Sequence, residues 1–171
     1  MSKRLTLKTF ICLLVGINLG AALARSQQAS GHDLQSPNGR IEIRIQTGEH
    51  LTYDVLVNDK TLLRNCSLSI DIDHKTLGLN PKVKATKPNT VDREIEPVVR
   101  QKSARLHENY NELRLEMEGN YAIVFRAYNE GVAYRLETSL PQSEVKVYSE
   151  EMSLNFAGDY NVYYPKEDSF L

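Results

Sequence analysis

The sequence predicts an all-β protein, an antiparallel β-sandwich. Three observations lead to this expectation. Apolar and polar residues alternate in short runs, Gly, Pro, Asn and Asp separate these runs, and no segment shows the 3.6-residue period of a long amphipathic helix. About ten such runs follow one another, which favours two sheets packed face to face rather than a single open sheet.

The first half of the sheet pattern begins with a hairpin. Residues 41–45 place isoleucine at every second position, and the alternation resumes at 51–57 after a polar turn. Asn58-Asp59 then predicts a tight turn, because both residue types tolerate a positive φ. The apolar residues of 61–63 and 68–72 extend the same sheet as two further strand segments.

The middle of the chain is less regular. Residues 74–89 contain Gly78 and two prolines with weak alternation, so we expect a long loop holding one short strand near Val83. From residue 111 the alternation strengthens, and Glu118-Gly119-Asn120 predicts the next turn.

The stretch 125–137, FRAYNEGVAYRLE, predicts a second hairpin. Both faces of the strand before its turn are apolar, which indicates a sheet covered on both sides by a second sheet or an adjoining domain. Gly131 is expected to supply the left-handed residue of a three-residue loop. The resulting pairing places Arg126 opposite Tyr134, with the guanidinium lying on the tyrosine ring.

The carboxy-terminal part predicts the last strands and the candidate binding residues. Strands are expected at 145–148, 153–156 and 161–164. Aromatic rings can stack on the C–H faces of sugars, and the rings least committed to a strand pattern are Tyr160, Tyr163 and Tyr164, which are therefore the candidate carbohydrate contacts. Core packing is the competing interpretation of aromatic residues at strand spacing.

The amino terminus predicts export. Lys3, Arg4 and Lys8 precede an apolar run, and Ala22-Leu23-Ala24 has the small residues that a signal peptidase requires, so residues 1–24 are predicted to be a cleaved signal peptide and the protein to be periplasmic or secreted. The run of about 14 residues is too short to cross roughly 30 Å of hydrocarbon. No membrane span is therefore expected after cleavage, and residues 25–171 form one predicted domain.

The net charge limits which partners are expected, and the cysteine content limits which disulfides can form. Cleavage removes three of the 21 basic residues and none of the 22 acidic ones, which leaves 18 against 22, a net charge of −4. Nucleic acid is not expected to bind such a chain. Cys66 alone remains, so no intrachain disulfide is expected.

No catalytic or metal-binding residue is predicted. The chain has no Gly-x-Ser-x-Gly motif, and four histidines stand far apart without a repeated spacing. Paired carboxylates would be needed for glycoside hydrolysis. The acidic side chains at 116 and 118 alternate with apolar residues along a strand, and those at 94 and 96 lie in a polar connection, so all four are interpreted as solvated.

Two segments resemble a known family. Residues 107–113, HENYNEL, and 125–135, FRAYNEGVAYR, look like the amino-terminal domain of the family 97 glycoside hydrolases, exported bacterial α-glucosidases and α-galactosidases. Ser36-Pro37-Asn38-Gly39 and Gly158-Asp159 support the resemblance. It implies a β-supersandwich related to galactose mutarotases, followed in family members by a (β/α)₈ barrel that holds the catalytic carboxylates. The chain is accordingly expected to stop before this barrel.

The resemblance also implies a cofactor and a substrate class. Full-length relatives hold Ca²⁺ near the active site, with one glutamate from the amino-terminal domain just after its Tyr-Pro segment. No ligand is carried over, and Glu167 and Asp168 are merely the nearest acidic residues. Residues 91–105 lack the tryptophans of many α-glucosidases, which favours the α-galactosidase branch.

Three functions follow as hypotheses. The first is a carbohydrate-associated domain that supports the catalytic barrel and substrate pocket of an exported α-glycosidase and is inactive alone. The alternative is a free-standing carbohydrate-binding module. A mutarotase-like epimerase, with His107 as acid and a glutamate as base, rests only on analogy of shape.

Overall fold

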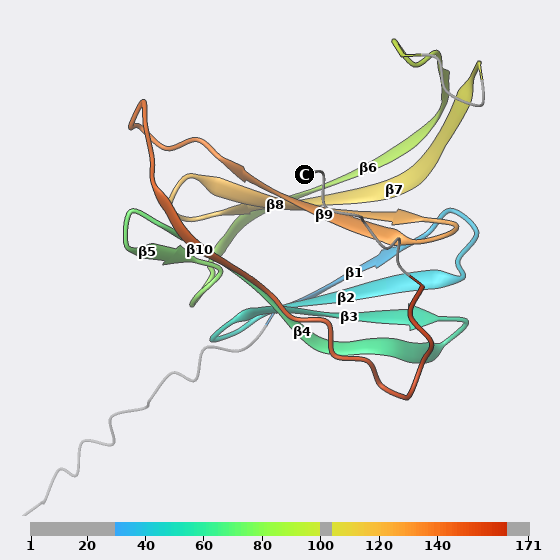
Figure 1. Ribbon diagram of the computed structural model, residues 1–171, viewed down its shortest axis with the longest axis horizontal. Helices are drawn as coiled ribbons and strands as arrows, with labels where there is room; N and C mark the ends of the chain where they lie inside the picture. Colours follow the sequence, from blue (N-terminus) through green and yellow to red (C-terminus); the bar gives the residue numbers. More distant parts are fainter. Residues whose placement is uncertain (1–29, 100–103, 164–171) are drawn as a thin grey trace, which may run out of the picture.

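The computed structural model describes residues 30–99 and 104–163 and confirms the all-β prediction. In these residues the chain forms strands and no helix. Figure 1 shows them as two layers that lie face to face. The strands are β1 (Ser30–Gln35), β2 (Ile41–Thr47), β3 (Leu51–Val57), β4 (Lys60–Ile72), β5 (Lys75–Leu77), β6 (Val83–Ile95), β7 (Leu106–Met117), β8 (Tyr121–Tyr128), β9 (Val132–Thr138) and β10 (Val147–Met152).

The two layers differ in size. The described residues place β1-β2-β3-β4-β10 in one sheet, with β5 also paired to β4, and β6-β7-β8-β9 in the other. Every strand pairing is antiparallel. Antiparallel sheets joined by short turns need no crossover helices, and this is why the alternating pattern alone predicted the fold class.

The core lies between the layers. Alternate residues of β2 and β8 point inward, so Ile43 and Ile45 on one sheet and Ile123 and Phe125 on the other are almost completely buried. The ring of Phe125 lies 5.7 Å, centroid to centroid, from that of Tyr53 on β3. These contacts join the two sheets into one hydrophobic cluster.

The first hairpin is confirmed, and the strand after it is longer than predicted. Asn58 and Asp59 have φ values of 50° and 62°, as their turn requires. The two expected segments at 61–63 and 68–72 belong to the single strand β4. Asn65, with a φ of 50°, lies where the β3–β4 register shifts, so a bulge rather than a turn interrupts the apolar pattern.

The expected loop at 74–89 was wrong. Most of it belongs to β5 and to the 13-residue strand β6. Pro88 is compatible with β6 because this strand lies at the edge of its sheet, where one side makes no ladder. Strand β7 also begins at Leu106, earlier than the expected 111, and its far half pairs with β6 in an arm that extends away from the sandwich in Figure 1.

The second hairpin is confirmed, but its predicted register was wrong by one residue. Arg126 lies opposite Ala133, and Phe125 lies opposite Tyr134. The Tyr128 amide donates to the Gly131 carbonyl, and the φ of Gly131 is not positive, so the loop has two residues rather than three. A one-residue shift exchanges the two faces of a strand.

This shift gives Arg126 a different aromatic partner. Its guanidinium carbon lies 4.4 Å from the ring centroid of Tyr110 on β7 instead of contacting Tyr134. The predicted arginine–tyrosine contact therefore exists, but with the neighbouring strand on the other side of β8.

Strand β8 is buried on both faces, as its sequence predicted, but its two covers differ. The inner face packs on the six-stranded sheet. On the outer face, Ala122 and Val124 are 2% and 3% exposed, and their cross-strand neighbours are charged residues. In the described part of the chain, the stems of long charged side chains cover these two positions.

Two sequence predictions concern regions at or near the ends. The predicted signal peptide, residues 1–24, lies outside the described residues. No helix in 30–99 or 104–163 is long and apolar enough to span a membrane. The strand expected at 145–148 is present but shifted, because β10 begins at residue 147 and ends at 152. The expected strand at 153–156 is reduced to an isolated bridge at Phe156, and the described residues of 161–164 form no strand.

Candidate functional site

The candidate aromatic residues belong to a segment that follows β10. This carboxy-terminal segment, residues 153–163, continues along β4 without being a regular strand. The Arg64 amide donates to the Asn155 carbonyl at 2.9 Å, and the Asn155 amide donates to the Sγ atom of Cys66 at 3.3 Å. Phe156 forms an isolated bridge with β4 as well. The backbone of the segment is thus held at its first half.

The structure separates the three candidate tyrosines. Tyr160 is 48% exposed, and its ring centroid lies 6.1 Å from that of Phe156. Gly158 permits this packing, because a Cβ atom there would come within 3.2 Å of the Tyr160 ring. Tyr163 is 91% exposed, and Tyr164 lies outside the described residues. Their contact with a sugar stays a prediction.

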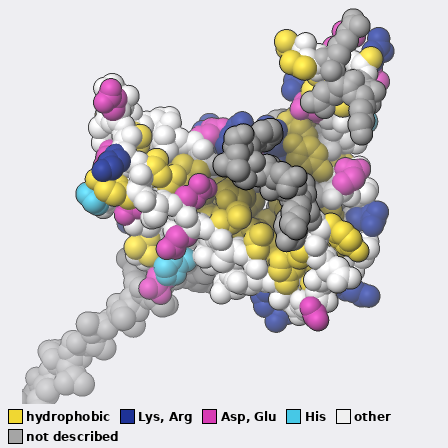
Figure 2. Space-filling model, viewed as in Figure 1, with side chains coloured by type: hydrophobic (Ala, Val, Ile, Leu, Met, Phe, Trp, Pro, Cys, Tyr) yellow, Lys and Arg dark blue, Asp and Glu magenta, His cyan; other side chains and the backbone are white. Residues whose placement is uncertain are grey.

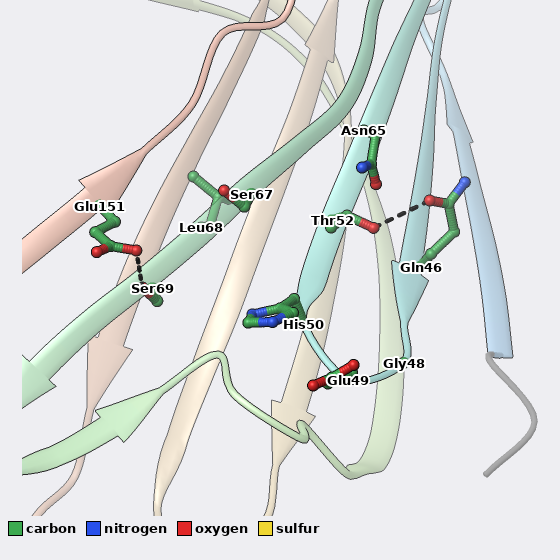
Figure 3. A pocket seen from close by; sticks show the side chains of 10 residues that line it. All are labelled: Gln46, Gly48, Glu49, His50, Thr52, Asn65, Ser67, Leu68, Ser69 and Glu151. Atoms are coloured by element: carbon green, nitrogen blue, oxygen red, sulfur yellow. Dashed lines mark hydrogen bonds between the residues drawn. The ribbon is translucent and has the colours of Figure 1, made fainter. Parts of the chain in front are cut away.

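A polar hollow lies on the outer face of the six-stranded sheet (Figure 3). Its volume is about 560 Å³. Thr52 donates to Gln46 at 3.1 Å on one side, and Ser69 donates to Glu151 at 3.4 Å on the other. The lining residues are Gln46, Gly48, Glu49, His50, Thr52, Asn65, Ser67, Leu68, Ser69 and Glu151.

The hollow can offer hydrogen bonds, and the only ring in its lining is the imidazole of His50. Its lining contains hydroxyl, amide and carboxylate groups, and no tyrosine or phenylalanine. The hollow was not predicted from the sequence. The available signal was the run of polar residues at the outward positions of β2, β3 and β4, which singly are typical of any solvated sheet face.

Charged side chains on the four-stranded sheet pair with each other. Arg126 donates to Glu112 at 2.6 Å, and Arg114 donates to Glu137. Partial burial acts to lower the pKa of Arg126, but bonding to Tyr128 and Glu112 outweighs it and raises that pKa. These pairs stabilise the strand ladder by holding opposite charges on neighbouring strands.

Two carboxyl groups of this sheet, those of Glu116 and Glu137, are stabilised in the ionised form. The hydrogen bond from Arg114 lowers the pKa of the Glu137 carboxyl, and the hydrogen bond from Lys87 lowers that of Glu116. A general acid at neutral pH requires a raised pKa. Neither carboxyl therefore suits that role.

His107 lies on the extended arm rather than in a cleft. Its Nε2 atom is 2.6 Å from Asp92 Oδ1, and both side chains are more than half exposed. Glu94, its cross-strand neighbour, pairs with Arg105 at 3.4 Å. His107 is thus hydrogen-bonded to Asp92 and the neighbouring Glu94 is ion-paired with Arg105, and no enclosed substrate site surrounds His107 among the described residues.

The described residues do not form a cation site. No group of three or more His, Cys, Asp or Glu side chains within 30–99 and 104–163 is arranged to hold a metal ion. Glu167 and Asp168 lie outside these ranges. The donor set that Ca²⁺ prefers, six to eight oxygen ligands, is therefore not assembled by the described part of the chain.

Comparison with known proteins decides the family. The sequence matches the family described as the glycosyl hydrolase 97 N-terminal domain over residues 34–171. The chain belongs to this family. A retaining α-galactosidase from Bacteroides thetaiotaomicron is 33% identical over 134 residues, which are 78% of this chain and 19% of that enzyme. The family 97 resemblance of the sequence is thereby confirmed.

Solved structures show the same fold. A glycoside hydrolase family 97 enzyme from Pseudoalteromonas sp. strain K8, in complex with acarbose, has a TM-score of 0.65 at 18% identity and is matched over 74% of this chain and 20% of its own. A β-arabinopyranosidase has a TM-score of 0.66 at 21% identity, with 73% and 21% matched. This chain thus spans about a fifth of the length of these relatives.

Proposed function

We propose that this family 97 domain is the carbohydrate-associated framework of an exported α-glycosidase that acts on α-galactosides in preference to α-glucosides. It supports a catalytic barrel and forms part of one wall of the substrate pocket. The observation that carries the proposal is the 33% identity to a segment that makes up 19% of a retaining α-galactosidase. The basic and apolar residues preceding Ala22-Leu23-Ala24 support export.

The domain itself is proposed to be inactive. Hydrolysis requires an acid and a second carboxylate facing each other across the sugar, about 5 to 10 Å apart. The described acidic residues with resolved pKa shifts, Glu116 and Glu137, are instead ion-paired and shifted toward the charged form. The purified protein should release no p-nitrophenol from p-nitrophenyl α-galactoside, and sustained turnover would contradict the proposal.

A hybrid enzyme tests the framework role directly. Residues 34–171 replace the matching segment of the Bacteroides thetaiotaomicron α-galactosidase, and hydrolysis of α-galactoside and α-glucoside is compared. The hybrid should be active and should prefer the galactoside, whereas the same enzyme with the segment deleted should be inactive. A folded but inactive hybrid would argue against a framework that is interchangeable within the family.

A free-standing carbohydrate-binding module is the second candidate. The observation that favours it is the exposure of Tyr160 and Tyr163, whose rings are open to a ligand. Calorimetric titration with galactose and with maltooligosaccharides would detect this binding. Affinity that is lost in Tyr163→Ala and kept in the matched exposed variant Tyr148→Ala would favour the module over the framework.

We propose a role for Ca²⁺ only in a full-length enzyme. Ca²⁺ bound beside the pocket would supply a fixed positive charge for substrate binding. We assign it no ligand within residues 30–99 and 104–163, because no suitable group is found there.

A further inference from the structure

At one side of the sandwich, one sheet extends further than the other. Strands β7 and β8 approach β1, and β8 also approaches β2. Further along, Tyr134 and Leu136 of β9 line a small gap together with Leu68 and Ile70 of β4 and Glu150 and Glu151 of β10. Strand β9 is the last strand of the described four-stranded sheet, so no further strand of that sheet extends over the carboxy-terminal part of β10 and the residues that follow it.

This open side exposes apolar side chains that belong to the inner face. Met152 lies opposite Leu68 in the β10–β4 register, and Phe156 lies opposite Leu63, so both point toward the other sheet. Met152 is nevertheless 52% exposed and Phe156 45% exposed, and Leu154 between them is 49% exposed. Figure 2, which looks onto this side, shows apolar side chains gathered between the layers.

At the edge of β9, four backbone amides have no partner among the described residues. The Tyr128 amide bonds the Gly131 carbonyl, and the Ser139 amide bonds the Asn120 carbonyl at the other end of the hairpin. Because hydrogen-bonded pairs alternate along an antiparallel ladder, residues 133, 135 and 137 bond to β8. The amides of 132, 134, 136 and 138 therefore point to the edge, where the described residues provide no strand.

Strand β9 also lacks the features that block pairing at the edges formed by β6 and β10. Strand β6 carries Pro88 and a register shift, and β10 carries a register shift and two exposed glutamates. The β8–β9 register is regular, and the strand has no proline. Its two charged residues, Arg135 and Glu137, pair at 2.5 Å on the outer face, which leaves the edge without an unpaired charge.

We infer that β9 accepts an added β-strand from the remaining part of a family 97 enzyme. The strand would be extended, would bond to the four outward amides of β9, and would place apolar residues at alternate positions over Met152, Leu154 and Phe156. The relatives carry about four-fifths of their length outside the matched region, so such a strand is available to them. The inference rests on the proposed framework role.

Amide hydrogen exchange tests the inference, because β9 contains its own control. The probe is the Bacteroides thetaiotaomicron α-galactosidase without its matched 134-residue segment. Adding it to the purified protein should slow exchange at 132, 134, 136 and 138 by roughly tenfold or more and leave 133, 135 and 137 much less affected, since the latter are already protected. Unchanged exchange at the four outward amides on binding of the probe would overturn the inference.

Two proline variants and the dependence of protection on protein concentration identify what occupies the edge of β9. Val132→Pro removes an outward amide without breaking a bond to β8 and should weaken binding of the probe, whereas Val98→Pro, on the exposed tip of the arm, should not. Protection that grows with the concentration of the chain alone would identify a second copy as the occupant and contradict the inference.

Measuring whether α-galactosidase activity is restored distinguishes a failure of the inference about β9 from a failure of the proposed framework role. Activity without protection of β9 would leave the framework role standing and refute the added strand. Protection of β9 without activity would support the added strand and count against the framework role.

Discussion

The buried hydroxyl of Tyr53 should make the protein unstable in alkali. Its side chain is 4% exposed, and burial, followed by the neighbouring Cys66 thiol, raises its pKa to about 12. An unfolded chain ionises its tyrosines near pH 10. The contribution to stability is therefore complete below pH 10 and is lost as the pH rises to 12, at which point a difference of two pKa units has removed about 3 kcal/mol.

Urea unfolding at a series of pH values measures this loss. The Tyr53→Phe variant should be less stable by about 1 kcal/mol at neutral pH, because the hydrogen bond between the Tyr53 hydroxyl and Cys66 is missing. Between pH 10 and 12 the two curves should converge and cross, since only the parent protein loses the ionisation contribution. Burial also raises the pKa of Tyr121, but this tyrosine is present in both proteins and cancels in the difference. Parallel curves over this range would refute the reasoning.

Two further predictions concern acid stability and backbone conformation. The hydrogen bond from Arg114 lowers the pKa of Glu137 in the folded protein, so the contribution of this pair to stability is present above the unfolded pKa and is lost as the pH falls through the folded pKa. In urea titrations, Glu137→Gln should therefore flatten the fall of stability below about pH 4.3, and an unchanged slope would contradict this. Gly78 has a φ of +94°, and a Cβ atom there would lie 2.4 Å from the Leu68 carbonyl oxygen; Gly78→Ala should cost roughly 1–3 kcal/mol or more, whereas Gly131→Ala, which has open space and no positive φ, should cost far less.

Burial explains which strands the sequence could predict. The strands β2, β3 and β8 contribute inward residues to the core, so their apolar positions recur with the two-residue period. Strand β6 is mostly exposed, and its residues therefore carry no such period. With Pro88 in its interior it looked like a loop, although its partner β7 supplies the whole ladder.

The register errors had a different cause. Sequence pattern indicates that 125–137 is a hairpin, but the choice between a two-residue and a three-residue loop depends on the backbone of Asn129 and Glu130. Nothing in these residue types decides it, and the wrong choice moved Arg126 from Tyr110 to Tyr134. The polar hollow was equally hidden, because its residues come together only when β2, β3, β4 and β10 are aligned.

The chemistry of the open side distinguishes a framework from a sugar-binding surface. Sugar sites combine aromatic rings with hydrogen-bonding groups, because a pyranose has C–H faces and a hydroxyl rim. Along the segment that holds Phe156 and Tyr160, Met152, Leu154 and Val162 are exposed and offer no hydrogen bonds to hydroxyl groups, whereas the exposed Asn155, Asp159 and Asn161 do offer them. Exposed apolar groups of this kind are typical of a protein interface. The apolar side chains therefore favour protein packed against this side, as the proposed framework role requires, and the polar residues of the same segment are where a sugar-binding module would differ.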